Sequence, residues 1–136
     1  MKVFLDANIL FSGAREDAPI RQLLDYLMGL HVELISNAFA AEEARRNVNI
    51  KRPAWAGSLE TLIDRIVISK ASATLDAVDI HDKDRPILRS AVGSRSTHLL
   101  TGDFKHFGHL LGKTVQGVKV ISARMLVDEL GITARE

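Results

Sequence analysis

The 136-residue chain contains no cysteine. This absence excludes a disulfide framework, a thiolate nucleophile and a zinc or iron–sulfur site with cysteine ligands, and it fits a reducing compartment. The five histidines are scattered, and no pair has the spacing of an HExxH motif. Any metal site is therefore expected to use oxygen ligands.

Long apolar runs are also missing. No stretch of about 18 apolar residues predicts a transmembrane helix, and Asp6 comes too early for the apolar core of a secretory signal. We therefore expect a cytoplasmic protein with no membrane partner. Aromatic residues make up only 5% of the chain, which argues against an extended platform for stacking bases.

The charges nearly cancel, with 18 Lys and Arg against 17 Asp and Glu. The net charge of +1 gives no case by itself for a nucleic acid partner, so any such case depends on where the charges lie. A hydrophobic fraction of 46% with 26% charged residues is typical of a globular protein. The length predicts one domain spanning residues 1–136.

Short apolar strands alternate with helical patterns along the chain. Strands are expected at residues 2–5, 32–35, 66–68, 97–101 and 118–121. Helices are expected from Pro19 to Gly29, from Ser36 or Asn37 to Pro53, over 58–66, from Asp84 past Val92, and over 123–130. This alternation predicts an α/β fold with three layers, in which helices cover both faces of a twisted, mainly parallel sheet of about five strands.

Acidic residues follow or adjoin these strands. They are Asp6 at the end of the first strand, Glu42 and Glu43 on the helix after the second, Asp82 and Asp84 at the start of the helix before the fourth, and Asp103 after the fourth. Each alone has a simple explanation as a helix cap, a turn residue or a solvated side chain. Those explanations do not account for their convergence at the carboxyl ends of the strands, where open α/β sheets bind ligands.

Such a cluster points to a metal site. Neighbouring carboxylates repel one another and raise each other's pKa, and a divalent cation removes that repulsion. Oxygen ligands suit Mg²⁺ or Mn²⁺. Two such ions about 4 Å apart can activate a water and stabilise the leaving oxygen of a phosphodiester. The pattern therefore predicts metal-assisted phosphodiester hydrolysis.

Four motifs in chain order resemble those of the PIN-domain nucleases. They are Phe4-Leu5-Asp6-Ala7-Asn8-Ile9-Leu10, Glu42-Glu43-Ala44-Arg45-Arg46-Asn47, Asp82-Lys83-Asp84-Arg85-Pro86-Ile87-Leu88, and Leu99-Leu100-Thr101-Gly102-Asp103. They span nearly the whole chain, whose length is that of a single PIN domain of the VapC-like toxin type.

The resemblance implies a PIN-like fold and a Mg²⁺- or Mn²⁺-dependent endoribonuclease, often the toxin of a toxin–antitoxin pair. It also implies an RNA substrate, an antitoxin partner and a homodimer. The catalytic metal ligands that it implies are Asp6, Glu43, Asp84 and Asp103, with Asn8, Thr101, Asp82 and Glu42 as supporting residues.

Two of these assignments choose between neighbouring acids. Asp84 is favoured over Asp82 because it stands three residues before Ile87, which is the family's helix spacing. Glu43 is favoured over Glu42 because it stands at the edge of the inward-facing stripe of its helix, and Glu42 lies about 100° further round.

Basic residues lie beside the acids in the sequence. Arg45, Arg46, Arg85, Lys105 and His106 are the expected RNA contacts. Cations beside an acidic metal centre suit RNA, because they hold phosphates while the metal meets the scissile group. A mixed solvated surface is the simpler explanation of any one of them.

Two other functions stay open. An RNA- or protein-binding module with a PIN-like fold and little or no catalysis would share the motifs, but the presence of all four acids argues against it. A phosphoacceptor receiver-type domain also binds Mg²⁺ beside an acid that ends a strand. It needs two adjacent acids near the N-terminus and a lysine after a late strand, and neither is evident.

Overall fold

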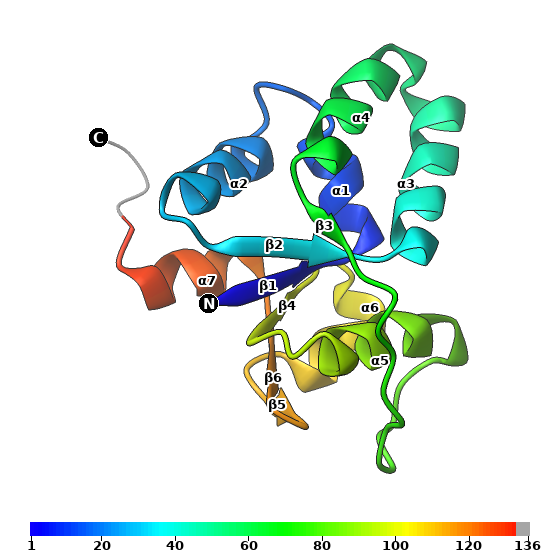
Figure 1. Ribbon diagram of the computed structural model, residues 1–136, viewed down its shortest axis with the longest axis vertical. Helices are drawn as coiled ribbons and strands as arrows, with labels where there is room; N and C mark the ends of the chain where they lie inside the picture. Colours follow the sequence, from blue (N-terminus) through cyan, green and yellow to red (C-terminus); the bar gives the residue numbers. More distant parts are fainter. Residues whose placement is uncertain (133–136) are drawn as a thin grey trace.

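Within residues 1–132, six strands form the central sheet (Figure 1). The computed structural model describes residues 1–132. The strands are β1 (Lys2–Leu5), β2 (Glu33–Ser36), β3 (Val67–Ile68), β4 (His98–Leu100), β5 (Thr114–Val115) and β6 (Val118–Ile121). Their order across the sheet is β3-β2-β1-β4-β6-β5, with β5 antiparallel to β6 and the other pairs parallel. The five predicted strands are confirmed with small differences at their ends.

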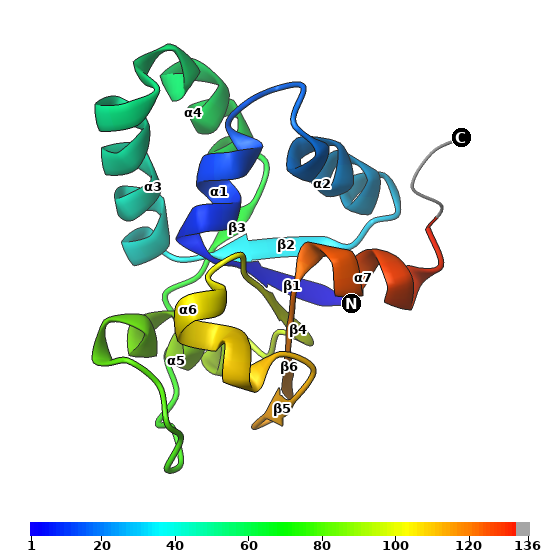
Figure 2. The same ribbon diagram turned by 180° about the vertical axis from the view of Figure 1, so that it is seen from behind.

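Helices cover both faces of the sheet. Those of the described residues are α1 (Ala7–Gly13), α2 (Pro19–Gly29), α3 (Ala38–Lys51), α4 (Ala56–Asp64), α5 (Arg85–Gly93), α6 (Phe104–Phe107) and α7 (Ala123–Leu130). Helices α1 to α4 lie on one face, and α5 and α6 lie on the other (Figure 2). Within residues 1–132, no helix is long and apolar enough to cross a membrane.

The structure adds three elements that the sequence analysis did not predict, namely α1, α6 and β5. Helix α1 follows β1 directly and has only seven residues, too few for its apolar period to stand out. Strand β5 pairs with β6 through a two-residue turn at Gln116 and Gly117, whose φ angles of 47° and 90° are both positive. Two positive φ angles match the right-handed twist of a hairpin, and the glycine adopts its own at no steric cost.

The central strands are buried on both sides. In β1, Val3, Phe4 and Leu5 are fully buried, and so are Leu99 and Leu100 in β4. A parallel strand covered on both faces is continuously apolar rather than alternating, which is why these runs are recognisable in the sequence. Polar side chains can therefore come together only where the strands end.

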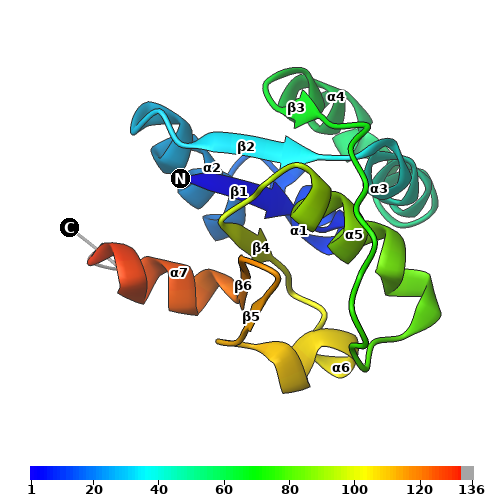
Figure 3. The same ribbon diagram turned by 60° about the horizontal axis from the view of Figure 1, so that its bottom comes forward.

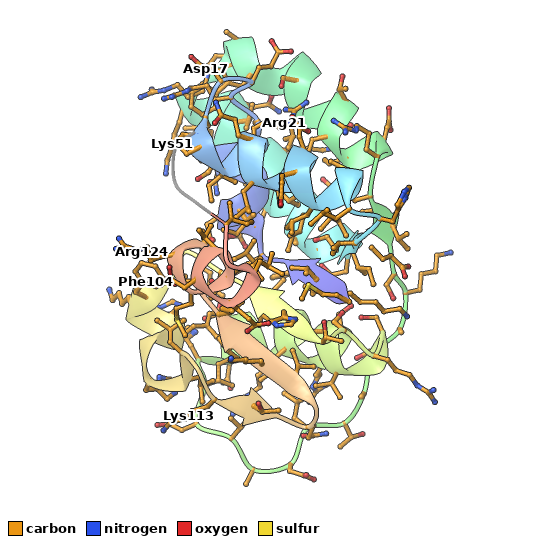
Figure 4. The ribbon with its side chains drawn as sticks, turned by 90° about the vertical axis from the view of Figure 1, so that its left-hand side faces the viewer. Asp17, Arg21, Lys51, Phe104, Lys113 and Arg124 are labelled. Carbon is orange, nitrogen blue, oxygen red and sulfur yellow. The ribbon has the colours of Figure 1, made fainter. Side chains whose placement is uncertain are left out.

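Arg21 on α2 is a buried charge that joins three helices. Its guanidinium donates hydrogen bonds to the carbonyl oxygen of Gly13 at 2.8 Å and to Oγ of Ser58 at 2.9 Å, and it lies 3.7 Å from a carboxylate oxygen of Asp25. Figure 4 shows Arg21 on the same side of the molecule as Asp17 and Lys51. The residue fixes α2 against the ends of α1 and α4.

The segment between β3 and α5 is irregular but attached to α5. The amide of Ala73 donates to the carbonyl of Arg89 at 3.0 Å, and Oγ of Ser90 donates to the carbonyl of Ala71 at 3.1 Å. At the end of α5, a Cβ added to Gly93 would lie 2.7 Å from the backbone nitrogen of Ser72. Only glycine lets the segment pass this close to the helix.

Gly93→Ala should therefore destabilise the fold by about 1–3 kcal/mol, because backbone rather than a flexible side chain must move. Gly57→Ala is the matched control, since a Cβ at this position in α4 meets nothing within 4 Å. Alanine is the better helix former, so that variant should gain up to about 1 kcal/mol. Urea denaturation of both variants measures the two effects, and equal stabilities would contradict the close approach at Gly93.

Candidate metal and catalytic site

The carboxyl ends of β1, β2, β4 and β6 lie at one edge of the sheet. Leu5 pairs with Leu100, and Leu100 pairs with Ile121, so these strands end in step. The next residues, Asp6 and Thr101, therefore lie side by side. In Figure 3 the arrowheads of β1 and β2 point toward α5 and α3.

Asp6 is the buried acid of this edge, with only 4% of its surface exposed. Its carboxylate caps α1 by accepting a hydrogen bond from the amide of Ala7 at 2.7 Å. It also accepts from Nδ2 of Asn8 at 3.0 Å and from Oγ1 of Thr101 at 2.8 Å. Asp6 is therefore both a helix cap, as its position after β1 suggested, and a carboxylate held by Asn8 and Thr101, as the resemblance implied.

Burial raises the pKa of Asp6 from 3.8 to about 6. The hydrogen bonds from Thr101, Ala7 and Asn8 oppose this rise, whereas the negative charge of Asp84 adds to it. A carboxylate that is costly to ionise beside a second one gains more from a bound cation than an exposed carboxylate does.

Asn8 and Thr101 also join the ends of β1 and β4 through backbone contacts. Oδ1 of Asn8 accepts from the amide of Gly102 at 2.6 Å, and Oγ1 of Thr101 accepts from the amide of Asp103 at 3.0 Å. Each side chain therefore holds both Asp6 and the turn after β4. This arrangement fixes Asp6 relative to Asp103.

Asp84 and Asp82 have different surroundings although they stand only two positions apart. Asp84 is 7% exposed and precedes α5, but its side chain makes no capping hydrogen bond. Asp82 has a side chain that is 95% exposed and forms an ion pair with Arg85 at 3.0 Å. Asp84 therefore has its carboxylate inside the site, and that of Asp82 faces solvent.

His106 lies between Asp84 and Asp103. Its Nδ1 is 2.7 Å from Oδ2 of Asp84 and 3.2 Å from Oδ2 of Asp103, whose other oxygen accepts from the amide of His106 and caps α6. Neither Nδ1 of His106 nor Oδ2 of Asp84 has a partner in hydrogen-bond geometry among the described residues, although both atoms are buried.

Glu42 and Glu43 also differ. Glu42 is exposed and bonded to Arg45 at 3.0 Å. Arg45 in turn makes two bonds to Glu60, at 2.7 and 3.0 Å, which hold the pKa of Glu60 below its usual value. Glu43 is half-buried, and its side chain has no hydrogen bond or ion pair within the described part of the chain. Its assignment as a metal ligand stays a prediction.

Three side chains meet as a candidate metal group: His81, Asp84 and His106. One ligand atom from each lies within 4.8 Å of those of the other two, and in residues 1–132 no other set of three or more acids or histidines is grouped this closely. This candidate group contains two imidazoles, which the expectation of oxygen ligands alone did not include, and both ligand sets stay predictions. His81 stands three residues before Asp84 and His106 three after Asp103, a spacing that could have pointed to them.

A cavity of about 540 Å³ lies beside the start of α5, and its lining includes Asp82 and Arg85 but none of the candidate metal ligands. Its wall carries the cations Lys70, Arg85 and Arg89 and the half-exposed ring of Phe39. Of the five predicted RNA contacts, only Arg85 lines it. Arg45 forms ion pairs with Glu42 and Glu60. Arg46 and Lys105 are exposed but do not line the cavity, and His106 contacts Asp84 instead.

No family model and no curated protein matches the sequence. Solved structures do share the fold. A chain in the crystal structure of VapBC2 from Rickettsia felis, bound to a DNA fragment from their promoter, matches with a TM-score of 0.63 at 15% identity, over 90% of this chain and 98% of that one. A chain in the structure of FitAB bound to an IR36 DNA fragment matches with a TM-score of 0.54 at 18% identity, over 88% and 94%.

This chain has their fold. The three-layer PIN-like α/β arrangement predicted from the sequence is thereby confirmed over most of the chain. At identities this low the similarity establishes the arrangement of strands and helices alone. The chemistry must be argued from the side chains at the carboxyl edge of the sheet.

Proposed function

We propose that this chain is a metal-dependent endoribonuclease and the toxin of a toxin–antitoxin pair. The observation that carries the proposal is the placement of three acids at the carboxyl ends of the strands. The charge of Asp84 acts on Asp6, and Asp84 and Asp103 both contact His106. Two of them are more than nine-tenths buried. Buried carboxylates without matching cations are costly, and a divalent cation offsets that cost.

Asp6, Glu43, Asp84 and Asp103 would hold Mg²⁺ or Mn²⁺, with Asp82 and Glu42 outside the ligand set. When bound, the ion lowers the pKa of water and neutralises charge on the scissile phosphate. Asn8 and Thr101 position the Asp6 carboxylate through their hydrogen bonds. Their hydrogen bonds to the turn after β4 also keep Asp6 and Asp103 at a fixed separation. A metal site with ligands from both strands requires such a fixed separation.

The basic cavity is the proposed path of the RNA backbone. Lys70 and Arg89 extend from its wall, and no acid within the described residues pairs with either side chain. Arg85 shares the wall but is paired with Asp82. The exposed ring of Phe39 offers one surface for a base to stack on, which fits single-stranded RNA.

Replacing both Lys70 and Arg89 by alanine should weaken RNA binding and make it less dependent on salt. Each phosphate of a single strand that a cation no longer neutralises lowers the slope of log K against log salt by about 0.7, so Lys70→Ala with Arg89→Ala should lower it by about 1.4. The control is Lys113→Ala. Lys113 precedes β5, which is the outermost strand on the side of the sheet away from β3 and the cavity (Figure 4). Fluorescence anisotropy with EDTA present measures binding without cleavage, and an unchanged slope would rule out this path.

The proposed partners are an antitoxin protein and a second copy of the chain. The similar chains come from structures named as VapBC2 and FitAB, each bound to DNA. By analogy, an antitoxin would cover the carboxyl ends of the strands, where Asp6, Asp84 and Asp103 lie, and would prevent cleavage until it is removed.

Cleavage of a mixed RNA pool tests the proposed function. We expect endonucleolytic products with Mg²⁺ or Mn²⁺, none with EDTA, and recovery when metal is restored. RNA binding that survives EDTA, with no cleavage under any divalent ion, would instead identify a binding module with a PIN-like fold.

A further inference from the structure

The geometry points to a mixed imidazole and carboxylate site. We propose that His81, Asp84 and His106 bind a first-row transition-metal ion such as Co²⁺ or Zn²⁺ more tightly than Mg²⁺. The inference concerns the same edge of the sheet as the proposed nuclease site, but it rests on the three ligands and not on cleavage.

The three side chains have the spacing of metal ligands. Bonds of about 2.1 Å to Zn²⁺ place two ligand atoms about 3 to 4 Å apart. Nδ1 of His106 and Oδ2 of Asp84 are 2.7 Å apart, and the whole group lies within 4.8 Å. Small side-chain movements would therefore bring all three atoms onto one ion.

The second observation is a pair of buried atoms that lie close together without forming a hydrogen bond. Asp84 is 7% exposed, and its Oδ2 lies 2.7 Å from Nδ1 of His106 but not in hydrogen-bond geometry; neither atom has another hydrogen-bond partner in the described residues. Buried polar atoms are rarely left without partners, because the loss of hydration is not recovered. A cation bound by both atoms, after a small movement apart, would use both of their lone pairs.

His81 is already placed to complete the group. Its ring stacks on that of His106 with centroids 4.6 Å apart and planes 9° from parallel. Its Nδ1 accepts a long hydrogen bond of 3.2 Å from the amide of Lys83, in an exposed position. A metal bond through Nδ1 would replace this weak contact and leave an amide that water can reach.

The ligand types decide the preferred ion. Imidazole nitrogen suits Zn²⁺, Co²⁺ and Ni²⁺, whereas Mg²⁺ is bound through carboxylates, phosphates and water. Asp103, 3.2 Å from His106, could add a further oxygen to the same ion. Two imidazoles with one or two carboxylates therefore favour the transition ions.

Titration of the metal-free protein with Co²⁺ and with Mg²⁺ tests the proposal. We expect a visible Co²⁺ band at one ion per chain, its displacement by Zn²⁺, and weaker binding of Mg²⁺ by calorimetry. His81→Ala should weaken Co²⁺ binding at least tenfold and Mg²⁺ binding far less. His31→Asn, an exposed histidine before β2 at the opposite end of the sheet, should bind Co²⁺ as the wild type does.

Three results would overturn the proposal. They are the absence of a Co²⁺ band, an unchanged Co²⁺ affinity in His81→Ala, and equally weakened binding of Co²⁺ and Mg²⁺ in that variant. The first would mean that the three side chains do not form a site for a transition-metal ion. Metal binding is measured without RNA, so this test does not depend on cleavage. A protein that binds Co²⁺ but cleaves no RNA would refute the proposed nuclease and leave this inference intact.

Discussion

Asp84→Asn should reduce kcat/KM for RNA cleavage by about 1000-fold. The change keeps the shape of the side chain but removes the negative charge from a carboxylate that is 7% exposed and 2.7 Å from His106. A misplaced metal ion costs several kcal/mol of transition-state stabilisation, and each 1.36 kcal/mol is a factor of ten in rate. Steady-state cleavage of a labelled RNA measures the reduction.

Asp82→Asn is the informative comparison for this variant. It removes the same charge two residues earlier, from a side chain that is 95% exposed and paired with Arg85. Exposed ion pairs contribute about 1 kcal/mol or less, so the change in kcat/KM should stay below about tenfold. If the two variants lose activity equally, Asp84 is not the ligand within its motif.

The metal-free protein should lose stability through Asp6 as the pH rises from about 4 to 6. The folded-state pKa of Asp6 is raised from 3.8 to about 6, mainly by burial, so the folded protein holds a proton that the unfolded chain releases. The contribution of protonated Asp6 is fully present below pH 3.8 and is lost as the pH passes through about 6. The difference between the two pKa values corresponds to roughly 3 kcal/mol.

The difference between the wild type and Asp6→Asn isolates this effect, because other titrating groups are common to both proteins. Urea denaturation from pH 4 to 7 in EDTA should show that the wild type becomes less stable relative to the variant by up to about 3 kcal/mol. Saturating Mg²⁺ or Mn²⁺ should reverse most of the loss in the wild type alone. A difference that does not vary with pH would contradict the raised pKa.

The sequence predicted the parts of the fold that depend on long apolar patterns. Strands β1 and β4 were recognisable because both of their faces are buried, and α7 because Gly131, in a left-handed conformation with φ of 69°, ends it. Helix α6 has four residues and β5 has two, so neither is long enough to show a period. Their positions depend on the turn at Gly117 and the cap at Asp103, which are local features.

The sequence likewise predicted only part of the candidate site. The residues that end strands, Asp6 and Thr101, follow from the sheet register, which any parallel α/β pattern implies. His81 was not expected, because its place beside His106 depends on how the segment before α5 meets α6. The surroundings of Glu43 depend on the rotation of α3 about its axis, which an apolar stripe fixes only to within about one residue.

In the segment before α5, the residues needed for folding differ from those that face the cavity. The segment is held to the helix by backbone groups of Ala71 and Ala73 and by the missing side chain of Gly93. The side chains that it presents to the cavity, such as Lys70 and Ser72, are free of those contacts. If RNA follows this cavity as proposed, substitutions there would change which RNA binds without displacing Asp6 or Asp103, so substrate preference could change while the proposed metal ligands stay the same.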